Sequence, residues 1–223
     1  MADAVPKREY SLRLGSTAPD FEADTTIGRI KFHEWLGNSW GILFSHPGDF
    51  TPVCTTELGE VARRAKDWEA RNVKVIGISA NGLEEHAKWI EDINSFGGKT
   101  AGPTDVQFPI SLTSMTCWTT RTSPTVTTKV FPSPSVPSSS STPQRKIRLT
   151  LNYPAVAGRN FDEIIRAIDA IQLGDKHRIA TPVNWNKGQD VIIHASVNNE
   201  EAKTLFPNHV AHLPYLRTTP LDS

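Results

Sequence analysis

The stretch WGILFSHPGDFTPVC, residues 40–54, joins a short apolar run to the start of a predicted helix. Its first six residues suit a buried strand, and residues 54–72 carry apolar side chains at helical spacing. Thr51 suits the N-cap and Pro52 the first helical position, so Cys54 falls near the third residue of the helix. This order of strand, loop and helix indicates a β-α unit of an α/β domain.

The same alternation continues along the chain. Further strands are predicted at 73–79, 146–152 and 190–194, and further helices at 83–96, 160–174 and 198–206. The pieces beyond Gly174 are short and punctuated by prolines. We therefore expect an α/β domain with a mainly parallel sheet, followed by a small C-terminal α+β module.

Composition excludes several classes of function. The 223 residues include 24 basic and 24 acidic side chains, and this zero net charge argues against nucleic acid or an anionic membrane as a partner. The sequence contains no run of eighteen apolar residues, and its N-terminus resembles neither a signal nor a transit peptide, so we expect a cytoplasmic protein without integral membrane contact. The histidines lack metal-ligand spacing and no glycine-rich phosphate loop occurs, so neither a metal nor a cofactor is expected.

Cysteine usage points to chemistry rather than to disulfides. The only two cysteines, Cys54 and Cys117, are too few for a disulfide framework. At the start of a helix, the sulfur of Cys54 would lie near the positive end of the helix dipole, which favours the thiolate. With the Thr51 hydroxyl nearby, such a thiolate could attack a peroxide oxygen and become a sulfenic acid. The alternative is a small apolar residue that faces the sheet.

The run PGDFTPVC fits the Pro-x-x-x-Thr-x-x-Cys pattern of the peroxiredoxins. The chain resembles their one-cysteine, peroxiredoxin-6-like branch of the alkyl hydroperoxide reductase family. The likeness covers residues 14–59, 147–185 and 199–220. It implies a thioredoxin-like peroxidase domain at 8–174, a dimerisation module at 175–223, and a homodimer.

The resemblance also implies roles for individual residues. Cys54 would be the peroxidatic cysteine, Thr51 would orient the peroxide, and Pro47 would shield the thiolate. Three supporting residues would be His46 at the pocket rim, with Glu57 and Arg159 in a polar network beneath it. For Arg159 the alternative is an exposed residue at the start of a helix.

The resemblance implies a thiol-dependent peroxidase for hydrogen peroxide and organic hydroperoxides. Cys117 does not resemble a resolving cysteine, so an external thiol such as glutathione or a thioredoxin-like protein would regenerate Cys54.

Residues 111–142 do not fit the family. They are rich in serine and threonine, and by composition we expect them to be irregular or disordered. Family-like codons read one nucleotide late can give residues 114–122 and 133–142, so the segment looks out of frame, with an expected arginine codon falling across Ser135 and Val136. The chain as written should then lack a central strand, fold poorly and have weak activity. The alternative is a genuine loop, and tryptic peptides of the native protein, such as TSPTVTTK, would decide between the two.

Two other functions stay open at this stage. A phospholipase A2-like hydrolase could use His33 and Ser39, whose spacing in KFHEWLGNSWG matches the family. An inactive protein or a holdase could bind unfolded clients at an exposed sheet edge, if the segment 111–142 is real.

Overall fold

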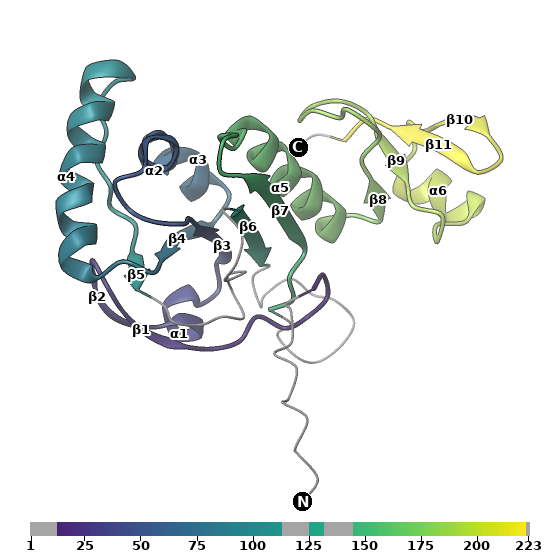
Figure 1. Cartoon of the computed structure of the whole chain (residues 1–223). Helices are drawn as coiled ribbons and strands as arrows, with labels where there is room; N and C mark the ends of the chain where they lie inside the picture. The colour runs from purple at the N-terminus through teal and green to yellow at the C-terminus, as the bar shows by residue number, and fades with distance from the viewer. Residues whose placement is uncertain (1–12, 113–124, 132–144, 222–223) are drawn as a thin grey trace, which may run out of the picture. The chain divides into compact units, whose positions relative to one another are not determined.

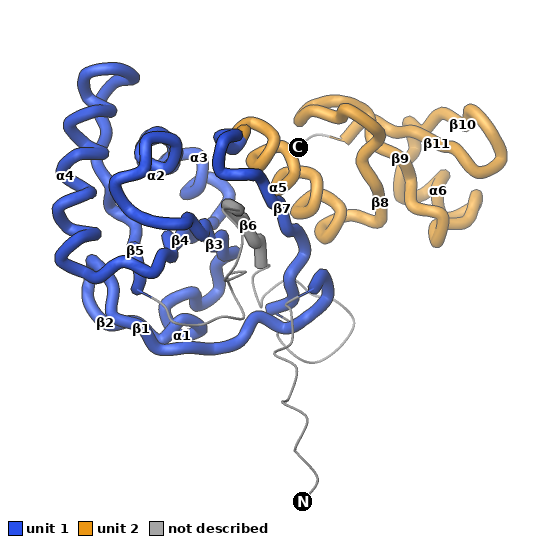
Figure 2. The backbone as a smooth tube through the Cα atoms, in the orientation of Figure 1, with its two compact units in different colours: residues 1–135, 141–159 blue, residues 136–140, 160–223 orange. Residues whose placement is uncertain are grey.

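A computed structural model describes residues 13–112, 125–131 and 145–221 (Figure 1). These residues form two compact units, one ending at residue 159 and the other beginning at 160 (Figure 2). The boundary between the units lies before the helix that we assigned to the peroxidase domain. The predicted domain bounds, 8–174 and 175–223, concern function and stay a prediction.

The first unit contains a seven-stranded sheet with the order β2-β1-β5-β4-β3-β6-β7. Its strands are β1 Glu22–Thr25, β2 Gly28–Lys31, β3 Trp40–Ser45, β4 Val73–Ser79, β5 Ile110–Leu112, β6 Thr125–Phe131 and β7 Leu149–Pro154. Only the β3–β4 and β4–β5 pairs are parallel, and the other pairs are antiparallel. The expectation of a mainly parallel sheet is therefore wrong, because antiparallel pairs flank the central parallel strands on both sides.

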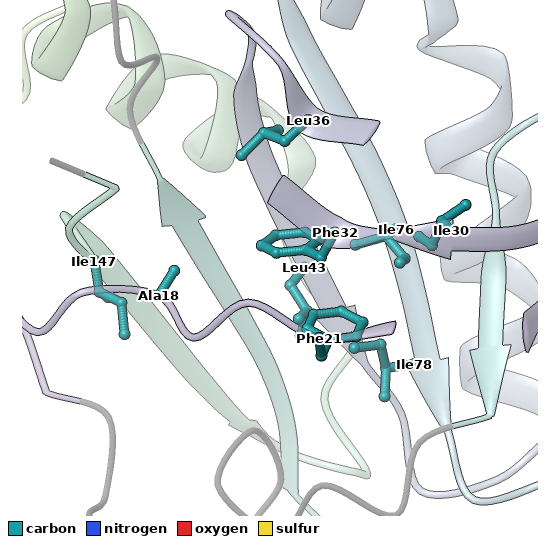
Figure 3. Close-up of a cluster of buried hydrophobic side chains, with 9 residues drawn as sticks. All are labelled: Ala18, Phe21, Ile30, Phe32, Leu36, Leu43, Ile76, Ile78 and Ile147. Carbon is teal, nitrogen blue, oxygen red and sulfur yellow. The ribbon is translucent and has the colours of Figure 1, made fainter. Parts of the chain in front are cut away.

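Strand β3 lies near the middle of the sheet between β4 and β6, and all six of its residues are buried. This explains its unbroken apolar sequence, since a strand covered on both faces needs no alternation. Next to it, a core cluster includes Leu43, Ile76 and Ile78 (Figure 3). The rings of Phe21 and Phe32 stack in this cluster with centroids 4.7 Å apart.

Strand β6 corrects one expectation about the segment 111–142. The residues TVTTKVF are mostly β-branched, which favours a strand, and they pair with both β3 and β7. The sheet therefore has a strand where we expected a gap. Residues 113–124 and 132–144, including Cys117 and the position of the missing arginine codon, lie outside the described residues, so the reading-frame interpretation stays a prediction.

The described residues of the first unit form four helices: α1 Phe32–Leu36, α2 Pro52–Arg63, α3 Ala65–Ala70 and α4 Leu83–Thr100. The single helix predicted at 54–72 is thus two helices separated at Arg64. The Trp68 indole N–H donates to the Val61 carbonyl at 2.9 Å. In an uninterrupted helix the same carbonyl would accept from the Ala65 N–H, so this indole bond lies where the two helices meet.

The second unit contains helices α5 Phe161–Lys176 and α6 Asn199–Leu205, and a four-stranded sheet with the order β10-β11-β9-β8. The strands are β8 Ile179–Ala180, β9 Val191–Ile193, β10 Val210–Leu213 and β11 Leu216–Thr219. A separate apolar cluster around Trp185 forms its core. The small α+β module predicted from the sequence is confirmed, and so is the Asn160 cap of α5, whose side chain accepts from Glu163 N–H at 3.1 Å.

Candidate active site

Cys54 is the third residue of α2, as the sequence predicts, and it is only 2% exposed. Thr51 is the N-cap by position, with an extended backbone, but its hydroxyl donates to the Gly48 carbonyl at 2.9 Å rather than capping the helix. Thr51, three residues before Cys54, also acts on the Cys54 thiol and lowers its pKa. The fold therefore brings the predicted nucleophile and the predicted peroxide-orienting residue together.

The surroundings of Cys54 act on its pKa in opposite directions. Burial raises the pKa of the thiol, Thr51 lowers it, the charge of Glu57 raises it and that of Arg159 lowers it. The net change is upward. Burial is the largest of these effects, and the expected contribution of the helix start stays a prediction.

Glu57 and Arg159 form a buried ion pair next to Cys54. The Arg159 backbone N–H donates to Glu57 Oε1 at 2.7 Å, and its guanidinium donates to both carboxylate oxygens at 3.1 and 2.6 Å. The guanidinium also lies over the Phe44 ring, 5.1 Å from its centroid. Arg159 is 6% exposed, so it is not an exposed arginine at a helix start.

Two other predicted site residues, His46 and Pro47, lie in the loop between β3 and α2 and differ in burial. Pro47 is exposed, whereas the His46 side chain is completely buried. The expectation that His46 lies at the rim of a pocket is thus wrong. A buried imidazole needs a polar partner, and His46 finds one in Asp49.

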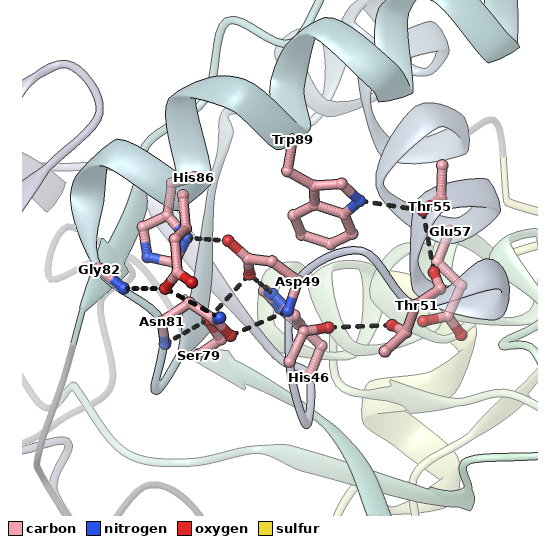
Figure 4. A network of polar contacts seen from close by, with 12 residues as sticks. His46, Asp49, Thr51, Thr55, Glu57, Ser79, Asn81, Gly82, His86 and Trp89 are labelled. Carbon is pink, nitrogen blue, oxygen red and sulfur yellow. Dashed lines mark hydrogen bonds and ion pairs between the residues drawn. The ribbon is translucent and has the colours of Figure 1, made fainter.

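Asp49 is the centre of a buried polar network that the sequence analysis missed (Figure 4). Its carboxylate contacts His46 Nε2 at 3.0 Å and His86 Nδ1 at 2.5 Å, and it accepts from the Ser79 hydroxyl at 3.0 Å. Its backbone N–H donates to Asn81 Oδ1 at 2.9 Å. His46 lies three residues before Asp49 in the same loop. The other partners come from the end of β4, the loop after it and the first turns of α4, so local spacing in the sequence could not have revealed them.

The network shifts two pKa values. Burial would raise the pKa of Asp49, but the hydrogen bonds and charges of His46 and His86 lower it to about 2. Burial lowers the pKa of His46, although the hydrogen bond and charge of Asp49 act against that change. At neutral pH the network therefore combines a carboxylate with a neutral His46.

Trp89 connects this network to α2. Its indole N–H donates to the Thr55 hydroxyl at 3.0 Å, and Thr55 donates to the Thr51 carbonyl at 2.9 Å. The Trp89 ring is fully buried, with its centroid 5.0 Å from that of His46. One side chain of α4 thus supports both the N-terminus of α2 and the imidazole.

His33 and Ser39, the predicted hydrolase pair, have separate partners. His33 Nε2 contacts the Ala18 carbonyl at 2.9 Å, and its Nδ1 lies 3.8 Å from Asp20. Ser39 donates to Asn72 Oδ1 at 2.9 Å. These contacts hold a loop in place and do not favour a hydrolase.

Within the described ranges, no cluster of three or more His, Cys, Asp or Glu side chains could hold a metal ion. Among the helices that the structure describes, none is long and apolar enough to cross a membrane.

Two family profiles match the sequence. The AhpC/TSA family matches residues 14–114, and the C-terminal domain of 1-Cys peroxiredoxin matches residues 170–209. Each match includes part of one compact unit, and the first includes Cys54 and the Asp49 network.

The similarity to individual proteins extends along almost the whole chain. Mouse Peroxiredoxin-6 is 44% identical over 228 residues, which cover 94% of this chain and 97% of the mouse protein. The mitochondrial peroxiredoxin PRX1 of Saccharomyces cerevisiae is 44% identical over 218 residues, covering 93% of this chain and 80% of the yeast protein.

Solved structures agree with this. A Cys-to-Ser mutant of the Peroxiredoxin 6 of Arenicola marina superimposes with a TM-score of 0.83 at 40% identity, covering 95% of this chain and 99% of that one. The yeast mitochondrial 1-Cys peroxiredoxin gives a TM-score of 0.82 at 41% identity, covering 94% and 100%. These matches establish the predicted thioredoxin-like fold, and this chain belongs to the one-cysteine peroxiredoxins.

Proposed function

We propose that Cys54 is the residue at which this protein, a thiol-dependent peroxidase, reduces hydrogen peroxide and organic hydroperoxides. The supporting observation is the position of Cys54 as the third residue of α2, three residues after Thr51, where Glu57 and Arg159 of a buried ion pair act on its pKa. Sulfur attacks one peroxide oxygen, the O–O bond breaks, and the products are a sulfenic acid and water or an alcohol. Thr51 orients the peroxide, and Pro47 shields the sulfur.

The sulfenic acid needs an external thiol. Cys54 is the only free cysteine among the described residues, and Cys117 lies outside them. A first thiol forms a mixed disulfide with Cys54 and releases water, and a second thiol releases Cys54. Glutathione or a thioredoxin-like protein is the proposed reductant, in keeping with the glutathione and thioredoxin systems named for the yeast structure.

We further propose a homodimer that the C-terminal module stabilises. Large apolar side chains are exposed on its β10–β11 hairpin: Tyr215 is 79% exposed, Val210 53% and Leu213 44%. A second copy would cover such a surface. The cytoplasmic address stays a prediction, because one relative is named as mitochondrial.

Substitution of the two cysteines tests the proposed function. Cys54→Ser should abolish peroxide consumption in a coupled glutathione or thioredoxin assay, whereas Cys117→Ser should retain it. Mass spectrometry after one equivalent of peroxide should find one added oxygen on Cys54. A Cys54→Ser protein with full peroxidase activity would refute the assignment.

A further inference from the structure

Asn81 is the only asparagine in the sequence that a glycine follows directly. The pair lies between β4 and α4, where Gly82 is the N-cap of α4 (Figure 4). Asparagine is a chemically labile residue, because the backbone nitrogen that follows it can attack its side-chain amide. Glycine has no side chain to obstruct that attack. The sequence therefore contains one pair that is especially able to lose ammonia from its asparagine.

The fold holds both reacting groups of this pair. Oδ1 of Asn81 accepts from the Asp49 backbone N–H at 2.9 Å, and Nδ2 of Asn81 donates to Glu85 Oε2 at 3.1 Å. The Gly82 backbone N–H donates to the same Glu85 oxygen at 3.0 Å. The amide that would be attacked and the nitrogen that would attack it are thus both bound to Glu85.

These contacts oppose the reaction. To form a bond, Cγ of Asn81 must turn towards the Gly82 nitrogen, and that nitrogen must lose its hydrogen. The turn breaks the hydrogen bonds of the amide with Asp49 and Glu85. Hydrogen bonds from Gly82 and Asn81 lower the pKa of Glu85, so its carboxylate is charged at neutral pH. An amide anion at Gly82 would face this negative charge, which disfavours its formation.

The restraint depends mainly on one exposed side chain. Asn81 and Gly82 are half-buried and Glu85 is exposed, whereas Asp49 is buried. Hydrogen bonds at an exposed site open more readily than those in the interior. The contacts of Glu85 are therefore the ones whose opening would release the pair, and water can then reach it.

We propose that Asn81 is a site of spontaneous deamidation and that Glu85 controls its rate. When the Glu85 contacts open, the Gly82 nitrogen bonds to Cγ of Asn81 and the Cγ–Nδ2 bond breaks. Ammonia leaves with the hydrogen of the Gly82 N–H. Water then opens the cyclic imide and gives an aspartate or an isoaspartate at position 81. The inference does not depend on the role of Cys54.

Either product should weaken the connection between β4 and α4. An aspartate at position 81 replaces an N–H donor by a second carboxylate next to Glu85, and the two like charges repel. An isoaspartate lengthens the main chain by one carbon directly before Gly82, the N-cap of α4. We expect the modified protein to melt at a lower temperature, and Asn81→Asp to reproduce this loss.

Substitutions of Glu85 and Gly82 test the proposed control. Glu85→Ala removes both contacts, whereas Glu85→Gln keeps an oxygen that can accept from the Gly82 N–H. Gly82→Ala obstructs the attack, and its methyl carbon would lie in ordinary contact with Glu85 Oε2, at 3.9 Å. Mass spectrometry of the tryptic peptide 75–88, after incubation at neutral pH, measures the replacement of NH₂ by OH at Asn81.

We expect Glu85→Ala to deamidate at least about tenfold faster than wild type, because two hydrogen bonds to a charged group are lost. Glu85→Gln should stay close to wild type. Adding Gly82→Ala to Glu85→Ala should return the rate to the wild-type value or below. Equal rates in wild type and Glu85→Ala would overturn the inference, and so would a double variant as fast as Glu85→Ala.

A second measurement needs no variant. Wild-type protein should deamidate at Asn81 at least about tenfold more slowly when folded than in concentrated urea, where these contacts are absent. Equal rates in the two conditions would show that the fold does not restrain the pair, which contradicts the proposal. A wild-type melting temperature for Asn81→Asp would refute the expected loss of stability.

Discussion

Glu57 and Arg159 stabilise each other in the interior while acting on Cys54 in opposite directions. Their side chains are 3% and 0% exposed, so neither charge can be solvated if its partner is removed. The Glu57 carboxylate raises the pKa of the Cys54 thiol, but the same carboxylate holds the Arg159 guanidinium, which lowers that pKa. This is a compromise between stability and reactivity at a single residue.

Substitutions in this ion pair should separate stability from reactivity. Arg159→Met and Glu57→Gln should each lower the free energy of unfolding by about 3–5 kcal/mol, because each leaves a buried charge unpaired. Arg159→Met should raise the pKa of Cys54, and Glu57→Gln should lower it. Urea unfolding and the pH dependence of Cys54 alkylation measure the two effects.

The double variant is the control for this prediction. It removes both charges, so it should recover part of the lost stability. Shifts of the Cys54 pKa in the same direction in both single variants would contradict the assignment of opposite effects.

At the scale of elements, two adjacent glycines of α4 differ in their surroundings. A methyl group on Gly97 would collide with the Thr104 side chain, whereas one on Gly98 would have no neighbour within 4 Å. We expect Gly97→Ala to destabilise the protein by about 1–3 kcal/mol through overpacking. Gly98→Ala should stabilise it by about 0.5–1 kcal/mol, because alanine is the better helix former. Thermal unfolding of both variants measures this, and equal effects would show that α4 packs differently.

Helices and strands that have a local sequence signal, such as an apolar run or a capping residue, could be predicted from the sequence. Strands β3 and β4 begin and end at the predicted residues, and Asn160 caps α5. The break at Arg64 could not be predicted, because apolar side chains keep their helical spacing on both sides of it. The short strands β1 and β2 were not predicted either, because neither is long enough to show an alternation of apolar and polar residues.

In the candidate active site, too, only the residues placed by local sequence signals could be predicted. Thr51 and Cys54 lie within one turn of each other, so helix-start signals place both. His86 lies 37 positions after Asp49 in the sequence, and only the pairing of β3 with β4 brings these segments together. Contacts of that kind depend on the tertiary fold rather than on local sequence.

For the whole molecule, the buried network predicts a loss of stability in acid. The pKa of Asp49 falls from 3.8 to about 2 on folding, which stabilises the protein by about 2 kcal/mol above pH 4. This contribution disappears as the pH falls towards 2. The lowered pKa of His46 acts in the same direction, because its contribution is complete above about pH 6.5 and is lost as the pH falls below that value.

Urea unfolding between pH 7 and pH 2 tests this prediction against Asp49→Asn. The variant cannot titrate at this position, so its stability should depend less steeply on pH below 4. Parallel curves for the two proteins would show that Asp49 carries no such linkage.

The place of β6 in the sheet has a consequence for synthesis of the chain. Strand β3 pairs with β4 on one side, soon after it in the sequence, and with β6, Thr125–Phe131, on the other. While the ribosome adds the residues between β4 and β6, β3 is a mostly apolar strand with one unpaired edge. The nascent protein therefore keeps an aggregation-prone edge after β4 is complete, until β6 emerges, and a chaperone would still protect it during this interval.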